Sequence, residues 1–438
     1  MTIEIKKIEI LLILILCLPL VLADSIEEEW NATIPLRFRV LDSIYSTEQT
    51  KEGLEIISEL EGDTSFKSDL VILEIDLDGN IESKRKMNGV FDDIRPQTVK
   101  KTSDGGYITT TQSFVNQTFN EEQFILLKTD SNGTQEWNKT FDSKTDWILT
   151  YETFETIDNG FFIFGGIDNY SNGVSTSFII KTDARGNEEW IRTYDAVRAG
   201  EEWLSTYDGP SKLVYDAYEA LNGGFILAGE TVLEEKSFNW IEKIDLDGNI
   251  VQYKSLEGIL DGGAIWSALE TKDENLVIVG DKSVNEKSDI EVIKLDSDGN
   301  LNWTSSFGGI DEDVPTMVKE TKDKGYIIAG KTKSFGEGEW DALFIKVDEN
   351  GKILWNITIG STENDEPFFI EQLTEKNIIH KIINYLTGVQ KYIVAGTTKS
   401  EYWLIGLKEK KFPIVGLLLS IAILFTLGFL IFRKLYPR

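Results

Sequence analysis

Acidic side chains recur just ahead of a set of short alternating strands, and their type and spacing point to cation binding. Carboxylate oxygens are the ligands that hard cations such as Ca²⁺ prefer. If these strands are the innermost strands of a ring, the carboxylates encircle the mouth of its channel. The alternative is that each aspartate caps its own loop. The residues of this predicted metal site are Asp93, Asp146, Asp261, Asp313 and Asp365.

Histidine and cysteine offer little catalytic chemistry. The sequence has one histidine, His380, and one cysteine, Cys17, which lies in an N-terminal segment that we expect to be removed. A lone histidine cannot form a His-based metal cluster, and the mature chain then has no thiol. We therefore predict no catalytic residues and no cofactor other than calcium. A glycosidase-like enzyme remains the alternative, because carboxylates are abundant.

A long segment between two repeats, residues 193–213, is a candidate partner-binding loop. It carries Tyr194, Trp203 and Tyr207 among charged residues. Aromatic side chains on a long exposed loop suit recognition of a protein or a glycan. The alternative is a loop folded onto its own repeat.

Tight Asp/Asn-Gly turns recur about every 50 residues. Each follows a short apolar strand such as 124–128, and in four copies a tryptophan stands four residues after the glycine, as Trp303 does after Gly299. Asparagine, aspartate and glycine tolerate positive φ, so the pattern predicts hairpin turns rather than calcium loops. The glycines of these turns are Gly79, Gly133, Gly186, Gly248, Gly299 and Gly351.

A second repeated segment, an apolar strand flanked by glycines, occurs in seven copies. Its clearest copies are 224–229 and 325–330. Four short strands with tight turns at this period are typical of propeller blades, and a solenoid is the alternative. The last copy lacks a final strand, whereas residues 29–33 match that strand. We therefore predict an all-β, seven-bladed β-propeller over residues 24–408, closed by an N-terminal strand in which residues 28–34 pair with 401–408.

The repeat resembles that of secreted bacterial and archaeal β-propellers, whose units read roughly D-G-G-Y-I-x-A-G and then x-L-I-K-x-D-x-x-G-x-x-x-W. Residues 104–107, 325–330 and 344–355 carry this pattern. The resemblance implies the fold and leaves the activity open. The turn with its tryptophan is also similar to the docking motif of quinoprotein dehydrogenases, so a quinoprotein-like enzyme is a further alternative.

Hydrophobic segments at both ends predict secretion and anchoring. Lys6, Lys7, an apolar run and Ala23 indicate a signal peptide over residues 1–23. Residues 412–432 carry no charge and are long enough for a transmembrane helix, between a linker at 409–411 and a cytoplasmic tail at 433–438. The tail also resembles the sorting tails of archaeal surface proteins that archaeosortases process. We expect a single-pass cell-membrane protein with the propeller on the extracytoplasmic side.

Charge and glycosylation signals agree with an outside location. The formal net charge is −30, which argues against nucleic acid as a partner. Sequons for N-glycosylation begin at Asn31, Asn116, Asn132, Asn138, Asn169, Asn302 and Asn356. We predict an acidic surface glycoprotein that binds an extracellular protein or glycan, or contributes to the cell envelope, without catalysis.

Overall fold

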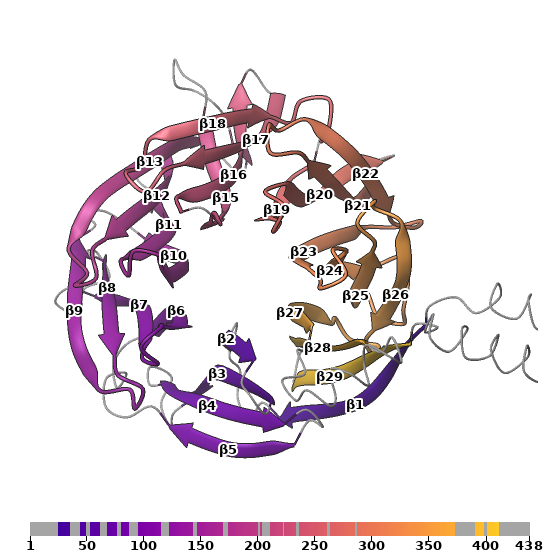
Figure 1. Ribbon diagram of the computed structural model, residues 1–438, viewed down its shortest axis with the longest axis horizontal. Helices are drawn as coiled ribbons and strands as arrows, with labels where there is room; N and C mark the ends of the chain where they lie inside the picture. The colour runs from indigo at the N-terminus through magenta and orange to yellow at the C-terminus, as the bar shows by residue number, and fades with distance from the viewer. Residues whose placement is uncertain are drawn as a thin grey trace, which may run out of the picture.

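Seven antiparallel sheets make up the described part of the protein. The computed structural model describes residues 25–35, 44–49, 53–61, 68–76, 80–86, 95–114, 122–142, 147–169, 174–199, 202–203, 211–221, 223–233, 236–260, 263–284, 287–372, 390–397 and 401–410. Every regular element in these ranges is a β-strand. Figure 1 shows the sheets around a common centre, with β2, β6, β10, β15, β19, β23 and β27 nearest to it. The predicted all-β, propeller-like repetition is confirmed.

Six sheets follow one another along the chain, each running outward from the centre. The first three contain β2 (Ile44–Gln49), β3 (Gly53–Glu61), β4 (Ser68–Asp76) and β5 (Ile81–Lys86); β6 (Arg95–Lys101), β7 (Tyr107–Phe114), β8 (Glu122–Thr129) and β9 (Gln135–Asp142); and β10 (Trp147–Glu155), β11 (Phe161–Asn169), β12 (Val174–Thr182), β13 (Glu188–Ala199) and β14 (Glu202–Trp203). The next three contain β15 (Ser211–Glu219), β16 (Phe225–Leu233), β17 (Lys236–Ile244) and β18 (Ile250–Ser255); β19 (Ile265–Glu270), β20 (Leu276–Val284), β21 (Lys287–Leu295) and β22 (Leu301–Phe307); and β23 (Asp313–Glu320), β24 (Tyr326–Thr332), β25 (Asp341–Val347) and β26 (Ile353–Ile359).

The remaining sheet joins the two ends of the chain. It contains β27 (Glu366–Gln372), β28 (Gln390–Thr397) and β29 (Glu401–Lys410), with β1 (Ser25–Pro35) as its outermost strand. β1 runs antiparallel to β29, from Ser25 opposite Lys410 to Pro35 opposite Glu401. This is the strand pairing that the sequence predicts. His380 and Cys17 lie outside the described residues.

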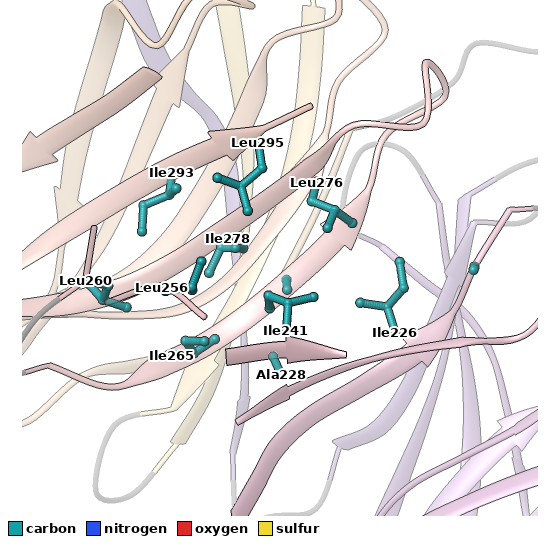
Figure 2. Packing of buried hydrophobic residues seen from close by; sticks show 12 residues of the cluster. Ile226, Ala228, Ile241, Leu256, Leu260, Ile265, Leu276, Ile278, Ile293 and Leu295 are labelled. Carbon is teal, nitrogen blue, oxygen red and sulfur yellow. The ribbon is translucent and has the colours of Figure 1, made fainter. Parts of the chain in front are cut away.

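The core lies between neighbouring sheets. All seven residues of β25 are buried, whereas the outermost strand β22 alternates between exposed and half-buried positions. A strand buried on both faces reads as a continuous apolar run, which explains the repeated apolar segments in the sequence. Figure 2 shows one such core, where Ile226 and Ile241 pack with Ile265 and Ile278 of the next sheet.

A buried lysine explains the glycine and aspartate of the repeated motif. Lys181 has no exposed side-chain surface, and its Nζ lies 2.9 Å from Asp158 Oδ2 and 2.9 Å from the carbonyl oxygen of Thr182. A Cβ on Gly160 would lie 2.4 Å from this Nζ. Only glycine fits here, because the same Cβ would lie 2.1 Å from the backbone carbonyl oxygen of Thr182, which cannot move aside as a lysine side chain can.

Lys128 and Lys346 repeat the arrangement in two other sheets. Their Nζ atoms lie 2.8 Å from Asp104 and 3.1 Å from Asp323, respectively. Burial raises the pKa of Asp104, but hydrogen bonds from Lys128, Thr102 and Gly106 outweigh it and lower that pKa to about 2. The charged ends of these lysines are therefore satisfied inside their own sheets.

Carboxylates and tryptophans connect each sheet to the next. The backbone N–H of Ile157 donates to Glu219 at 2.7 Å, and that of Leu221 donates to Glu270 at 2.6 Å. Toward the outside of the ring, Trp190 Nε1 donates to the carbonyl oxygen of Leu246 at 2.7 Å. The ring of Trp190 lies against Gly248 of that turn. The tryptophans of the motif thus serve inter-sheet packing.

Candidate functional site

Two of the five predicted cation ligands lie in the described residues, and each accepts hydrogen bonds from the loops of its own sheet. Asp313 is fully buried, and its Oδ2 accepts hydrogen bonds from Gly309 N at 2.8 Å and Ser334 Oγ at 2.7 Å. The hydroxyl of Thr332 donates to its other oxygen. Asp365 is also buried, and it accepts from the N–H of Ser361 at 2.7 Å.

Loop capping, the alternative that the sequence leaves open, therefore describes Asp313 and Asp365. Asp93, Asp146 and Asp261 lie outside the described residues. Within the described ranges, no group of three or more His, Cys, Asp or Glu side chains is placed to bind a metal ion. Because three of its five residues lie outside the described ranges, the site at the channel mouth stays a prediction.

The predicted binding loop needs a correction at Tyr194. This residue lies in β13, is 5% exposed, and donates from its hydroxyl to Glu242 Oε1 at 2.6 Å. Its ring stacks on Trp240 of the next sheet at a centroid distance of 6.0 Å. Tyr194 is thus part of an inter-sheet core rather than an exposed loop. Trp203 lies in β14, and Tyr207 lies outside the described residues.

The described sequons lie on strands and turns of the sheets. Asn132, Asn138, Asn302 and Asn356 are exposed, as a glycan acceptor must be. Asn31 lies in β1 and Asn169 in β11, and Asn116 lies outside the described residues.

A β-bulge interrupts the innermost strand at the same register position in all seven sheets. In each case the innermost strand has one residue with no partner on the second strand. Tyr215 is such a residue, because it stands between Val214 and Asp216, whose partners on the second strand are consecutive. A bulge redirects a side chain and often occurs beside a functional site. The extra residues are Tyr45, Gln97, Tyr151, Tyr215, Trp266, Thr316 and Phe368.

Three consecutive sheets place a large exposed aromatic residue at this bulge. Tyr151 on β10, Tyr215 on β15 and Trp266 on β19 are 53%, 41% and 44% exposed, respectively. All three strands lie next to the centre of the ring (Figure 1). Exposed aromatic residues at an equivalent position on neighbouring sheets are a candidate recognition surface. We call these three residues the rim aromatics.

The polar ends of two rim aromatics are fixed by carboxylates on the second strand. The hydroxyl of Tyr215 donates to Glu230 Oε2 at 2.5 Å, and Trp266 Nε1 donates to Asp281 Oδ1 at 2.7 Å. Tyr151 packs edge-on against Phe164 at a centroid distance of 5.4 Å. These contacts orient the rings and leave much of their surface in solvent.

A carboxyl group with an altered pKa follows the second bulge. Asp216 accepts hydrogen bonds from Ala217 N and from Ala268 N of the next sheet, each at 2.9 Å. Burial raises the pKa of Asp216 to about 6, and the negative charge of Glu152 adds to this rise. Glu152 itself pairs with Lys100 of the preceding sheet at 3.1 Å. Asp216 can thus hold a proton near neutral pH.

Sequence reasoning missed the rim aromatics, although a signal for them exists. Tyr151, Tyr215 and Trp266 each stand four residues ahead of a glutamate that ends the innermost strand, namely Glu155, Glu219 or Glu270. An aromatic residue in an alternating strand is normally assigned to the core, and only the bulge exposes it here. The surface offers aromatic faces and hydrogen-bond acceptors to a ligand.

Comparison with known proteins supports the fold and no particular activity. No family model and no curated protein matches the sequence. The structure of a puromycin hydrolase mutant is similar with a TM-score of 0.50 at 10% identity, over 82% of this chain and 50% of that one. This chain therefore spans about half the length of that protein.

Two further solved structures are similar at lower scores. The core factor of S. cerevisiae has a TM-score of 0.44 at 12% identity, covering 96% of this chain and 70% of that one. A Synechocystis apocarotenoid oxygenase mutant has a TM-score of 0.42 at 12% identity, covering 74% of this chain and 73% of that one. None of the described segments is a helix with the length and hydropathy of a membrane span.

The raised pKa of Asp216 predicts a pH-dependent stability. Ionising this carboxyl costs more free energy in the folded state than in the unfolded state. The contribution of Asp216 to the free energy of unfolding is therefore fully present below about pH 4 and is lost as the pH rises toward 6. We expect the free energy of unfolding of the wild type to fall by up to about 3 kcal/mol across this window because of Asp216, as measured by urea unfolding. Asp216→Asn should flatten the decline, and a decline parallel to that of the wild type would contradict the assignment.

Proposed function

We propose that the protein is a membrane-anchored, cell-surface binding protein whose ligand, a protein or glycan, docks on the rim aromatics. In this proposal the seven sheets are the blades of a closed seven-bladed propeller over residues 24–408, related to the secreted propeller repeats that the sequence resembles. A signal peptide at 1–23 and a transmembrane helix at 412–432 place it outside the cell. The binding function requires no catalytic residue.

The repeated exposure of large aromatic residues at one structural position carries this proposal. Tyr151, Tyr215 and Trp266 are each held at their polar end or ring edge, so they meet a ligand with little loss of side-chain entropy. Tyrosine and tryptophan are the residues that most often dominate binding energy. The fold presents them on the innermost strands of three consecutive sheets.

A propeller enzyme is the second candidate, and one observation favours it. Asp216 has a pKa of about 6 and feels the negative charge of Glu152, and a carboxyl group with a raised pKa can serve as the general acid of a hydrolase. If a bound oligosaccharide is cleaved, and Asp216→Asn stops cleavage without weakening binding, the enzyme replaces the binding protein as the better account.

Substitution of the rim aromatics tests the binding function. Residues 24–411 are screened against a glycan array and a peptide array, and the variant Tyr151→Ala, Tyr215→Ala, Trp266→Ala is screened in parallel. We expect the variant to weaken the selected interactions at least about tenfold, because it removes the central aromatic contacts. The matched control is Ile81→Ala, Ile191→Ala, Leu301→Ala, which removes three exposed apolar side chains from the outer strands β5, β13 and β22. Unchanged binding by the rim variant would refute the proposal.

A membrane-impermeant amine reagent on intact cells tests the topology. Lysines between residues 24 and 411 should be labelled, whereas Lys434 should react only after lysis, because the bilayer excludes the charged reagent. Mass spectrometry of the labelled peptides reads out both regions. Labelling of the propeller only after lysis would place it inside the cell and overturn the proposed localisation.

A further inference from the structure

Two neighbouring sheets carry the same pairing of an exposed aromatic ring with a carboxylate. In one, Tyr215 donates to Glu230 at 2.5 Å; in the next, Trp266 donates to Asp281 at 2.7 Å. In both, the aromatic residue lies at the bulge of the innermost strand and the carboxylate lies on the second strand. We call Tyr215–Glu230 and Trp266–Asp281 the two aromatic–acid units.

The carboxylates of both units are held by neutral donors. Asp281 accepts from Trp266, from Ala264 N at 3.1 Å and from Ser288 Oγ at 2.9 Å. No described lysine or arginine lies within ion-pair distance of Glu230 or Asp281, whereas Glu152 on the preceding sheet is paired with Lys100. Hydrogen bonds from neutral donors leave the full negative charge in place, so each unit retains an uncompensated charge beside an aromatic face.

An aromatic face next to a carboxylate attracts an organic cation by two additive effects. The ring quadrupole favours a cation over its face, most strongly for tryptophan, and the carboxylate adds charge attraction. A neutral sugar would meet the same rings without compensating either charge. The formal net charge of −30 further raises the local concentration of cations.

We propose that the rim binds an oligoamine, one alkylammonium group at each aromatic–acid unit. The inference rests on the proposed function only in using the same rim as the binding site, and it assigns that rim an amine ligand in addition to the protein or glycan. A linear amine with two or more ammonium groups joined by short alkyl chains matches two units on adjacent sheets. The alkyl segments contact ring surface while the ammonium groups meet the carboxylates.

Calorimetric titration of residues 24–411 with spermidine tests the inference. We expect the variant Glu230→Gln, Asp281→Asn to weaken spermidine binding at least about tenfold, because both charges are lost. Trp266→Ala should weaken it as well, whereas Tyr215→Phe keeps the ring face and should change it by less than about threefold. A neutral diol of similar length is expected not to bind.

The control Glu257→Gln, Asp298→Asn removes two exposed carboxylates from turns outside the units. It reduces the net negative charge by the same amount as the variant Glu230→Gln, Asp281→Asn. It should leave spermidine affinity within about twofold, and an equal loss in the control would mean nonspecific attraction and overturn the inference.

If a glycan or peptide binds through the rim aromatics but spermidine does not, the inference fails and the proposed function stands. If rim substitutions change the binding of no probe, the proposed function fails too. Should the double variant not fold, Glu230→Gln and Asp281→Asn are titrated singly, and unchanged affinity in both overturns the proposal.

Discussion

The sheets of this protein bury their apolar surface against neighbouring sheets, so a single sheet would not be stable alone. The complete burial of β25 and the shared core around Ile241 and Ile265 show that the apolar surface belongs to sheet pairs rather than to single sheets. A linear stack would leave two end sheets exposed to water. The pairing of β1 with β29 joins the first and last described strands in one sheet, which is the arrangement that a closed ring requires.

Two kinds of residue depart from this apolar burial: buried lysines between the strands and exposed aromatic residues at the bulges. Lys181 and its equivalents occupy buried positions, but each is neutralised by an aspartate in the same sheet and is structural. The bulges, in contrast, bring Tyr151, Tyr215 and Trp266 out of the core at the inner end of each sheet. A rigid ring therefore presents side chains that differ from sheet to sheet on a constant backbone frame.

The repeat made the fold predictable, because each copy reports the same turn and the same buried strands. Even the partner of β1 was predictable, since Trp30 and Asn31 match the tryptophan strand that the last copy lacks. The individual side chains were harder to assign. Tyr194 was expected on a loop, but β13 continues through it and buries it against Trp240. The bulges and the capping of Asp313 depend on strand register and loop closure, which no local pattern specifies.

Ring closure by β1 is the central claim, and an engineered disulfide tests it most directly. Glu27 and Lys408 are antiparallel partners, and such partners have Cα atoms about 4.5–5.5 Å apart, within the range of a disulfide. A chain starting at residue 24 with Glu27→Cys and Lys408→Cys should form an intramolecular disulfide on oxidation and gain about 4 kcal/mol in stability. The mismatched pair Glu27→Cys and Glu401→Cys should not. Failure of the matched pair to cross-link, or cross-linking only between molecules, would contradict a ring closed by this strand.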